Sequence, residues 1–234
     1  IRHTFSGRET IDVRLDETTR VIELDGVGLA LVDARVASGD ETIDAAIRYD
    51  ADREKIALVL PHAIPAGAAR LTLGWSAALS HDLEGFYATE SRGRRYAFTH
   101  FEPASARRAF PCFDTPEQKA SFAITVVTDA ADTAVSNTPI EEEAPLDAAQ
   151  KMIRFAETPP LPTYLVAVAV GRLAALRTTV GTTPLSVIAP DDQLPLGRFA
   201  LDTAAALLPR FEAYFDRRYP FAKLDLVAVP AFAP

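Results

Sequence analysis

The 234-residue sequence has a single cysteine, a single tryptophan and a single methionine, and it has no apolar run long enough to span a bilayer. With only Cys112, an internal disulfide is excluded, which favours a reducing compartment, and we expect a cytoplasmic protein. The longest apolar run, residues 163–171, has the length of a strand, so we expect no membrane span. The N-terminal residues lack both an initiating Met and the features of a signal peptide, so we expect trimmed termini.

Basic charge is also scarce. The chain has 24 Lys and Arg residues against 32 Asp and Glu residues, which gives a net charge of −8. Binding to nucleic-acid phosphates requires clustered cations. The one basic cluster, residues 91–96, is short and is typical of a solvated hairpin tip. The composition therefore argues against a nucleic-acid partner.

Self-sufficient catalytic motifs are missing as well. No G-x-S-x-G, P-loop or G-x-G-x-x-G pattern occurs. None of the four histidines stands in an H-E-x-x-H motif or in a Cys/His metal spacing; they are His3, His62, His81 and His100. From the residues alone we therefore expect no metal site and no complete catalytic site in this chain.

What the sequence does contain is strand patterning. Over residues 1–190, roughly a dozen short segments alternate apolar with polar residues, and Gly, Pro, Asp or Asn turn signals separate them. This spacing predicts an all-β domain built as an antiparallel β-sandwich. The acidic stretch 141–150 interrupts the pattern, and we interpret it as a solvated loop.

The pattern changes after Pro190. Apolar residues then recur at the three- and four-residue steps of a helix; they are Phe199, Leu207, Phe211, Tyr214 and Phe215. Pro195 is suited to the first turn of this helix, and Pro209 is expected to kink it. A short strand follows at residues 223–230. We predict a second, incomplete α/β segment over residues 191–234. We expect residues 196–234 to be poorly ordered or packed against another chain, for example by self-association.

The stretch "THFEPASARRAFPCFDTPEQKASFAITV", residues 99–126, combines unlike residues at unusual density. We expect a strand that closes at Glu102, a turn capped by Ser105, and ion pairs between Arg107 or Arg108 and Asp114. In this interpretation the aromatics are buried and Cys112 is a small inert hydrophobe.

Glu102 fits that structural interpretation least well. It stands before a proline at a strand end and has no cationic partner at local spacing. Loops held by a rigid sheet are where binding groups usually lie. The residues therefore indicate Glu102 as a candidate binding group.

Three ordered stretches also resemble a known family. "GFYATES" with "RYAFTHFEPASARRAFPCFDTPEQKASFAITV", then "TPPLPTYLVAVAVG", then "YPFAKLDLVAVPAFAP" are similar to successive signatures of the aminopeptidase N family of zinc metallopeptidases (gluzincins). The similarity covers essentially the whole chain. It implies a saddle-shaped N-terminal β-sandwich at 1–190 and the start of a thermolysin-like catalytic domain at 191–234, which stops before the family's G-A-M-E-N segment.

The resemblance implies an enzyme that removes N-terminal residues from peptides. In that family a zinc ion polarises the peptide carbonyl and a Glu takes a proton from the zinc-bound water. This sequence resembles only the N-terminal part of the family's proteins. Beyond that part lie the family's zinc ligands, the Glu that takes the proton and a later tyrosine. We therefore expect no catalytic residue and no bound zinc here, and we expect these 234 residues to be inactive alone.

The resemblance also implies roles for two residues. Glu102 stands where the family places a Glu or Gln that binds the free α-amino group of the peptide. His100 stands where a Gln usually lines the pocket for the first side chain. That departure leaves the side-chain preference open, and His100 is equally well interpreted as an ordinary strand residue. Ser105 replaces a frequent Asp, and "FDTP" replaces the commoner "FDEP".

Two alternatives stay open at this point. The chain is also consistent with a stand-alone β-sandwich interaction module derived from the family. A stop codon after Pro234 favours that module, whereas continuation into Gly-Ala-Met-Glu-Asn favours the peptidase. A carbohydrate-binding sandwich is the weaker alternative, because it requires an exposed aromatic platform and Trp75 lies within an apparent strand.

Overall fold

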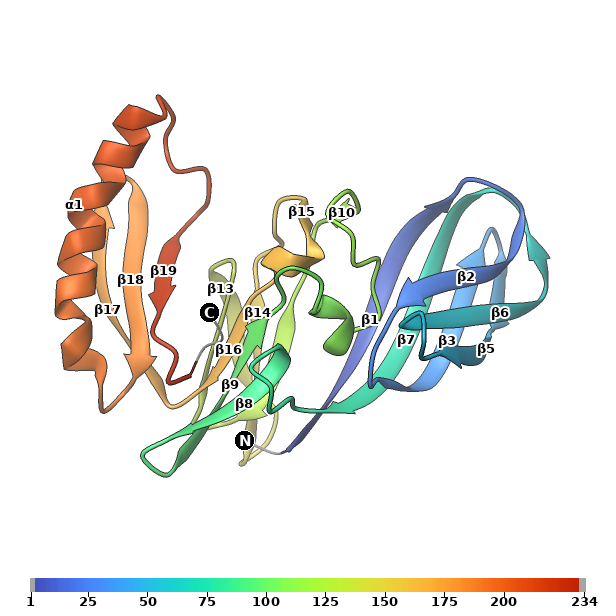
Figure 1. Cartoon of the computed structure of the whole chain (residues 1–234), viewed down its shortest axis with the longest axis horizontal. Helices are drawn as coiled ribbons and strands as arrows, with labels where there is room; N and C mark the ends of the chain where they lie inside the picture. The colour runs from blue at the N-terminus through green and yellow to red at the C-terminus, as the bar shows by residue number, and fades with distance from the viewer. Residues whose placement is uncertain (1–2, 232–234) are drawn as a thin grey trace.

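The computed structural model describes residues 3–231, and its strands form six sheets within that range. Figure 1 shows an N-terminal sandwich at one end, a central group of strands, and a sheet carrying α1 at the other end. This arrangement confirms a mostly β fold with a short helical segment near the C-terminus.

The N-terminal sandwich is built from two antiparallel sheets. Their orders are β1-β7-β3-β4 and β2-β6-β5. The strands are β1 (Thr4–Leu15), β2 (Thr19–Asp25), β3 (Ala30–Ser38), β4 (Glu41–Asp44), β5 (Ala46–Asp50), β6 (Lys55–Ile64) and β7 (Gly67–Ala78). Alternate residues of each sheet point inward and form one core, which includes the fully buried Leu24, Val36, Leu58, Leu71 and Leu73.

Trp75 connects this sandwich to the rest of the molecule. β1 pairs with β7 along all of its twelve residues, which places Gly7 opposite Trp75. A Cβ atom at Gly7 would lie 2.2 Å from Trp75 Cζ2, so the indole is accommodated only because Gly7 has no side chain. The indole Nε1 donates a hydrogen bond to the Ala109 carbonyl at 2.9 Å. Trp75 is thus buried and offers no exposed aromatic platform.

Two further sheets make up the central part. One has the order β12-β16-β9-β8 and the other β11-β14-β13. Their strands are β8 (Gly85–Ser91), β9 (Arg94–His100), β11 (Thr125–Asp129), β12 (Thr133–Ser136), β13 (Ile140–Pro145), β14 (Gln150–Phe155) and β16 (Val168–Gly171). A short pair, β10 (Lys119–Ala120) and β15 (Leu161–Pro162), and two 3₁₀ turns, η1 (Ala106–Arg108) and η2 (Thr163–Leu165), complete this part.

The prediction of a loop over residues 141–150 is wrong in its first half. Glu141, Glu142 and Glu143 belong to β13, an edge strand paired with β14. Their carboxylates pair across the sheet, since Arg154 contacts Glu141 at 2.9 Å and Glu142 at 3.1 Å. A charged run therefore forms an exposed edge strand because cross-strand cations balance it.

The C-terminal part is a small α/β unit. β17 (Leu173–Val180), β18 (Thr183–Pro190) and β19 (Leu224–Val227) form one sheet, and β18 and β19 are parallel. The connection between them contains η3 (Leu194–Gly197) and α1 (Arg198–Tyr214). The predicted boundary after residue 190 falls inside this connection, between two strands of one sheet, and its position stays a prediction.

α1 packs on its own chain. Leu201 and Leu208 are buried, Leu201 against Leu185 and Val187 of β18, and Pro209 lies inside the helix. η3 and α1 are therefore folded onto β17 and β18, and β19 pairs with β18, whereas residues 232–234 lie outside the described range. The outward face of α1 stays exposed, with Phe199 82% and Tyr214 81% accessible. Packing of that face against another chain stays a prediction.

Within residues 3–231, no helix has both the length and the apolar character needed to cross a membrane.

Candidate functional site

The candidate site lies at the end of β9, where the chain enters the segment 101–116, here called the corner. β9 ends at His100, two residues before the predicted end of the strand. Phe101 is buried, and the Glu102–Pro103 peptide bond is cis. The corner then contains the 3₁₀ turn η1 and returns toward β10.

An apolar cluster fixes the inner side of the corner. The rings of Phe101 and Phe110 meet edge to face with centroids 5.8 Å apart, and Phe110 meets Phe122 in the same way at 6.4 Å. Their buried neighbours are Ala106, Ala109, Cys112, Leu161 and Val166. The prediction of buried aromatics in a rigid corner is confirmed for Phe101, whereas Phe110 and Phe113 are half-buried.

Cys112 joins the corner to the N-terminal sandwich through its backbone. Its carbonyl accepts a hydrogen bond from the Asp25 amide at 2.7 Å, and its amide donates to the Asp25 carbonyl at 3.2 Å. Burial, followed by the carboxylates of Asp114 and Glu9, raises the pKa of the Cys112 thiol well above its ordinary value. The thiolate is therefore disfavoured, and Cys112 behaves as the predicted inert hydrophobe.

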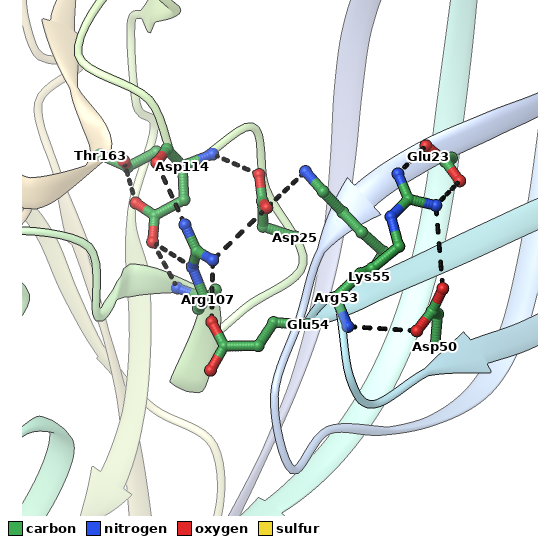
Figure 2. A network of polar contacts seen from close by, with 9 residues as sticks. All are labelled: Glu23, Asp25, Asp50, Arg53, Glu54, Lys55, Arg107, Asp114 and Thr163. Carbon is green, nitrogen blue, oxygen red and sulfur yellow. Dashed lines mark hydrogen bonds and ion pairs between the residues drawn. The ribbon is translucent and has the colours of Figure 1, made fainter.

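Arg107 is the centre of the polar contacts that hold the corner, as Figure 2 shows. Its Nε donates to Asp114 Oδ2 at 3.0 Å, and its Nη1 lies 2.9 Å from Glu54 Oε2. The same Nη1 lies 3.6 Å from Asp25 Oδ1. One guanidinium thus joins the corner to the end of β2 and to the turn before β6.

The two buried carboxylates have further partners. Asp114 Oδ1 accepts a hydrogen bond from the Thr163 hydroxyl at 2.6 Å. Asp25 accepts one from Lys55 Nζ at 2.6 Å and one from the Asp114 amide at 2.9 Å. Burial alone would raise the pKa of Asp25, but these hydrogen bonds and the charges of Lys55 and Arg107 hold it below its ordinary value. Both carboxylates are therefore satisfied by hydrogen bonds within the chain.

Other expected contacts of the corner differ from the prediction. The Ser105 side chain makes no capping hydrogen bond, so the predicted cap is absent. Arg108 is exposed and makes no ion pair within residues 3–231. Instead, its side-chain stem lies against Gly85, where an added Cβ would be 2.8 Å from Arg108 Cβ. Of the two arginines, only Arg107 pairs with Asp114.

Glu102 contrasts with the paired carboxylates. Its side chain is exposed, and it makes no hydrogen bond or ion pair with any residue from 3 to 231. The corner that carries it is fixed on its inner side by the aromatic cluster and by Arg107. The structure therefore presents an unpaired carboxylate on a rigid support.

His100 lies two residues before Glu102 at the same end of β9 and is half-buried. Its Nδ1 is 3.1 Å from the Leu83 carbonyl oxygen. A carbonyl only accepts hydrogen bonds, so Nδ1 carries the hydrogen in this contact. The ring orientation is thus set by the backbone of the segment that precedes β8.

Sequence reasoning missed most members of the Arg107 network. Arg107 and Asp114 are seven residues apart and were paired from the sequence, whereas the other members of the network come from distant segments; these are Asp25, Glu54, Thr163 and, through Asp25, Lys55. No local spacing signals such contacts. Among residues 3–231, no three His, Cys, Asp or Glu side chains are arranged to hold a metal ion.

Comparison with known proteins gives one family. Residues 1–165 match the family model of the peptidase M1 N-terminal domain. Aminopeptidase N of Acetobacter pasteurianus is 34% identical over 231 residues, which cover 97% of this chain and 64% of that protein. Aminopeptidase M1 of Arabidopsis thaliana is 35% identical over 241 residues, covering 98% of this chain and 27% of that protein. Aminopeptidase 2 of Candida albicans is 32% identical over 235 residues, which cover 98% of this chain and 25% of that protein. The chain thus spans under two thirds of these relatives.

Replacing Arg107 by Met should destabilise the fold strongly. The substitution leaves the buried Asp114 and Asp25 without their shared cation, although Thr163 and Lys55 still bond them. We expect a loss of about 3 kcal/mol in the free energy of unfolding, measured by urea denaturation. Arg108→Met is the matched control and should change it by less than about 0.5 kcal/mol. Equal losses in the two variants would contradict the assigned role of Arg107.

Acid should remove the contribution of Asp25. Because its pKa is lower in the folded state, Asp25 stabilises the fold above the unfolded-state value of about 3.9, and this stabilisation is lost as the pH falls through the folded-state pKa. The difference in free energy of unfolding between the unsubstituted chain and Asp25→Asn should therefore shrink between about pH 5 and pH 2. A difference that does not change with pH would show that the Asp25 carboxylate is not stabilised by ionic contacts.

Proposed function

The chain belongs to the peptidase M1 family, and from this membership we propose that it serves as the N-terminal domain of an enzyme that removes N-terminal residues from peptides. The match over residues 1–165 and the similarity to aminopeptidases over nearly the whole chain support this proposal. The peptide is the only partner that the proposed activity requires.

We assign to Glu102 the binding of the peptide's free α-ammonium group. The observation that carries this assignment is an exposed carboxylate with no partner among residues 3–231, placed on a corner whose other carboxylate, that of Asp114, is already paired. An ammonium offers three donors and a carboxylate only accepts, so the two form strong charge-assisted hydrogen bonds. An anchor for the amine also fixes which peptide bond is presented for cleavage, as an exopeptidase requires.

The rigidity of the corner supports the same role. A binding group that is already held in place loses little conformational freedom when the substrate binds. Arg107 and the aromatic cluster hold the corner from its inner side, and the Glu102 side chain is then the part that adjusts. His100, held through Nδ1 by the Leu83 carbonyl, is proposed to line the space for the substrate's first side chain.

The zinc ion of this enzyme is proposed to be held outside the described residues. Members of the M1 aminopeptidase family depend on zinc in general. The described residues do not offer a set of donors that fits the ion, because no three of their His, Cys, Asp or Glu side chains are grouped so as to hold it. The hydrolytic step is therefore assigned to another part of the enzyme.

Two further proposals concern the setting of the chain. The single, buried and unpaired Cys112 supports a reducing location, for which we propose the cytoplasm. The exposed aromatic residues of α1 support self-association of the 234-residue chain when it is studied alone.

Replacing Glu102 by Ala should lower the kcat/KM of an enzyme in which this chain is joined to a catalytic part, here called the joined enzyme. We suggest a chimera in which these residues replace the corresponding part of the Acetobacter pasteurianus aminopeptidase. Loss of a charge-assisted hydrogen bond should lower kcat/KM on aminoacyl chromogenic substrates by about ten- to a hundredfold. Glu17→Ala, which removes another exposed carboxylate, is the control and should have no effect.

A pair of inhibitors identifies the group that Glu102 binds. The Glu102→Ala change should weaken an inhibitor that carries a free amine and leave its deamino analogue unchanged. Equal weakening of both inhibitors, or a normal kcat/KM in the variant, would remove the assignment of Glu102 to the amine.

The 234-residue chain alone should not hydrolyse aminoacyl chromogenic substrates, even with added zinc, because its described residues offer no donors grouped to hold that ion. The check is initial-rate measurement against a buffer blank and against the chimera as positive control. Turnover by the purified chain above the blank would overturn the proposal that the hydrolytic residues lie elsewhere.

A further inference from the structure

The hairpin formed by β8 and β9 reaches from the candidate site to the α/β unit. At one end His100 pairs with Gly85, next to the corner, and at the other end Ser91 pairs with Arg94. The two strands pair over all seven residues without a register shift. At about 3.4 Å per residue, the hairpin is roughly 20 Å long. Figure 1 shows its turn on the side of the molecule that carries the α/β unit.

Two ion pairs hold the turn of this hairpin against the loop that follows β18. Arg92 Nη1 donates a hydrogen bond to Asp192 Oδ2 at 3.2 Å, and Arg94 Nη1 donates one to Asp191 Oδ1. Single exposed ion pairs stabilise a fold only slightly. Two pairs side by side nevertheless fix an orientation, because one pair alone allows the joined segments to rotate about it.

The backbone of the turn indicates that Arg92 is present for its side chain. Arg92 and Gly93 have φ values of 51° and 73°, and two such residues between paired strands form a type I′ turn, which favours Asn, Asp or Gly. An arginine is strained in this left-handed region. Its ion pair with Asp192 offsets that strain. Gln193 Nε2 adds a third contact from the same loop, to the Ser91 hydroxyl at 3.0 Å.

Tyr87, in the middle of β8, holds the α/β unit at a second place. Its side chain is fully buried, and its hydroxyl donates a hydrogen bond to the Ala231 carbonyl at 3.0 Å. Burial raises the pKa of the Tyr87 phenol, so the hydroxyl keeps the hydrogen that it donates. The ring also belongs to an apolar cluster between the two parts, which includes Tyr87, Tyr96 and Phe98 of the hairpin and Leu173, Ile188, Val227 and Val229 beyond it.

The other end of the hairpin carries the candidate site. Phe98 pairs with Tyr87 and lies two residues before His100 and four before Glu102. The corner packs closely on this end, because a Cβ atom at Gly85 would lie 2.8 Å from Arg108 Cβ. A displacement of the hairpin relative to the α/β unit would therefore displace the corner and its free carboxylate as well.

We propose that the hairpin β8–β9 sets the position of Glu102 relative to the α/β unit, with Arg92, Arg94 and Tyr87 as positioning residues. The inference rests on the proposed function, in which Glu102 binds the substrate amine and residues 191–234 begin the catalytic part. An exopeptidase that recognises the amine needs a fixed distance from the amine anchor to the reacting bond. The three residues act on this distance through the hairpin and not by contact with the substrate.

A purely structural role is the rival explanation. If these contacts only stabilise the fold, their loss should lower the free energy of unfolding and weaken all ligands of the enzyme alike. A positioning role predicts a different pattern. The fold then survives, and only ligands that depend on the amine anchor are weakened.

A distance measurement on the 234-residue chain tests the geometry without any assumption about catalysis. Spin labels are placed on Thr115→Cys in the corner and on Arg210→Cys on α1, both of which are exposed positions, whereas Cys112 is buried. The combined change Asp191→Asn and Asp192→Asn removes both ion pairs with little change in side-chain shape. The measured distance distribution should shift or broaden by roughly 1–2 Å.

Matched variants separate the positioning role from stability. Arg92→Asn removes one ion pair but suits the type I′ turn, so it should alter the distance distribution without lowering the urea midpoint. Tyr87→Phe should also alter the distribution. Tyr96→Phe is its control, because Tyr96 is equally buried in the same cluster and its hydroxyl has no hydrogen-bond partner among residues 3–231. Glu90→Gln, at an exposed position of the same hairpin, should change neither measurement.

Kinetics of the joined enzyme test the link to the amine anchor. The combined Asp191→Asn and Asp192→Asn change should lower kcat/KM by about tenfold, because a displacement of about 1 Å can lower a rate by up to about a hundredfold. In the Glu102→Ala background the same change should cause no further loss, since the anchor is already absent. An inhibitor with a free amine should be weakened, and its deamino analogue should not.

Different results overturn the inference and the proposed function. Distance distributions that stay unchanged in the ion-pair and Tyr87 variants, while Glu102→Ala lowers kcat/KM, would overturn the inference alone. An equal loss of kcat/KM in the presence and absence of Glu102 would show that the contacts are only structural. A normal kcat/KM in Glu102→Ala would overturn the amine anchor, and with it any anchoring role of the hairpin.

Discussion

The Arg107 guanidinium is the contact on which the geometry of the corner depends. It joins Asp114 in the corner to Asp25 at the end of β2 and to Glu54 before β6 (Figure 2). Burying such charges is expensive, and an apolar cluster of the same volume would often stabilise a fold equally well. We infer that the main effect of the ionic network is to fix how the joined segments are placed relative to one another, rather than to add stability. Its hydrogen bonds set the relative position of segments that apolar packing alone would allow to slide.

This network also explains which carboxylates are left for binding. Asp25 and Asp114 are buried, and each has at least two partners within the chain. Glu102 is exposed and has no partner among residues 3–231. An acidic chain thus divides its carboxylates into those that hold the fold and those that are available to a cation from outside. The peptide amine proposed at Glu102 is such a cation.

Much of the architecture follows from the sequence, because alternation along strands and helical spacing are local signals. They indicated the β-sandwich, α1 and β19, and the seven-residue spacing indicated the Arg107–Asp114 pair. The acidic strand β13 was missed because its charges are balanced only by Arg154 of the neighbouring strand. The partners of Arg107 and the contacts of the hairpin β8–β9 with the α/β unit were missed for the same reason: both arise from segments far apart in sequence. Glu102 was found because the residues before and after it offer no cation.

The central claim is that the Glu102 carboxylate binds the substrate amine from a corner that does not move. A crystal structure of the joined enzyme with an amine-bearing peptide analogue tests it most directly. The account predicts a Glu102 oxygen about 2.7–2.9 Å from the ammonium nitrogen, with the Arg107–Asp114 pair unchanged. An ammonium held by other groups, with Glu102 directed into solvent, would contradict it.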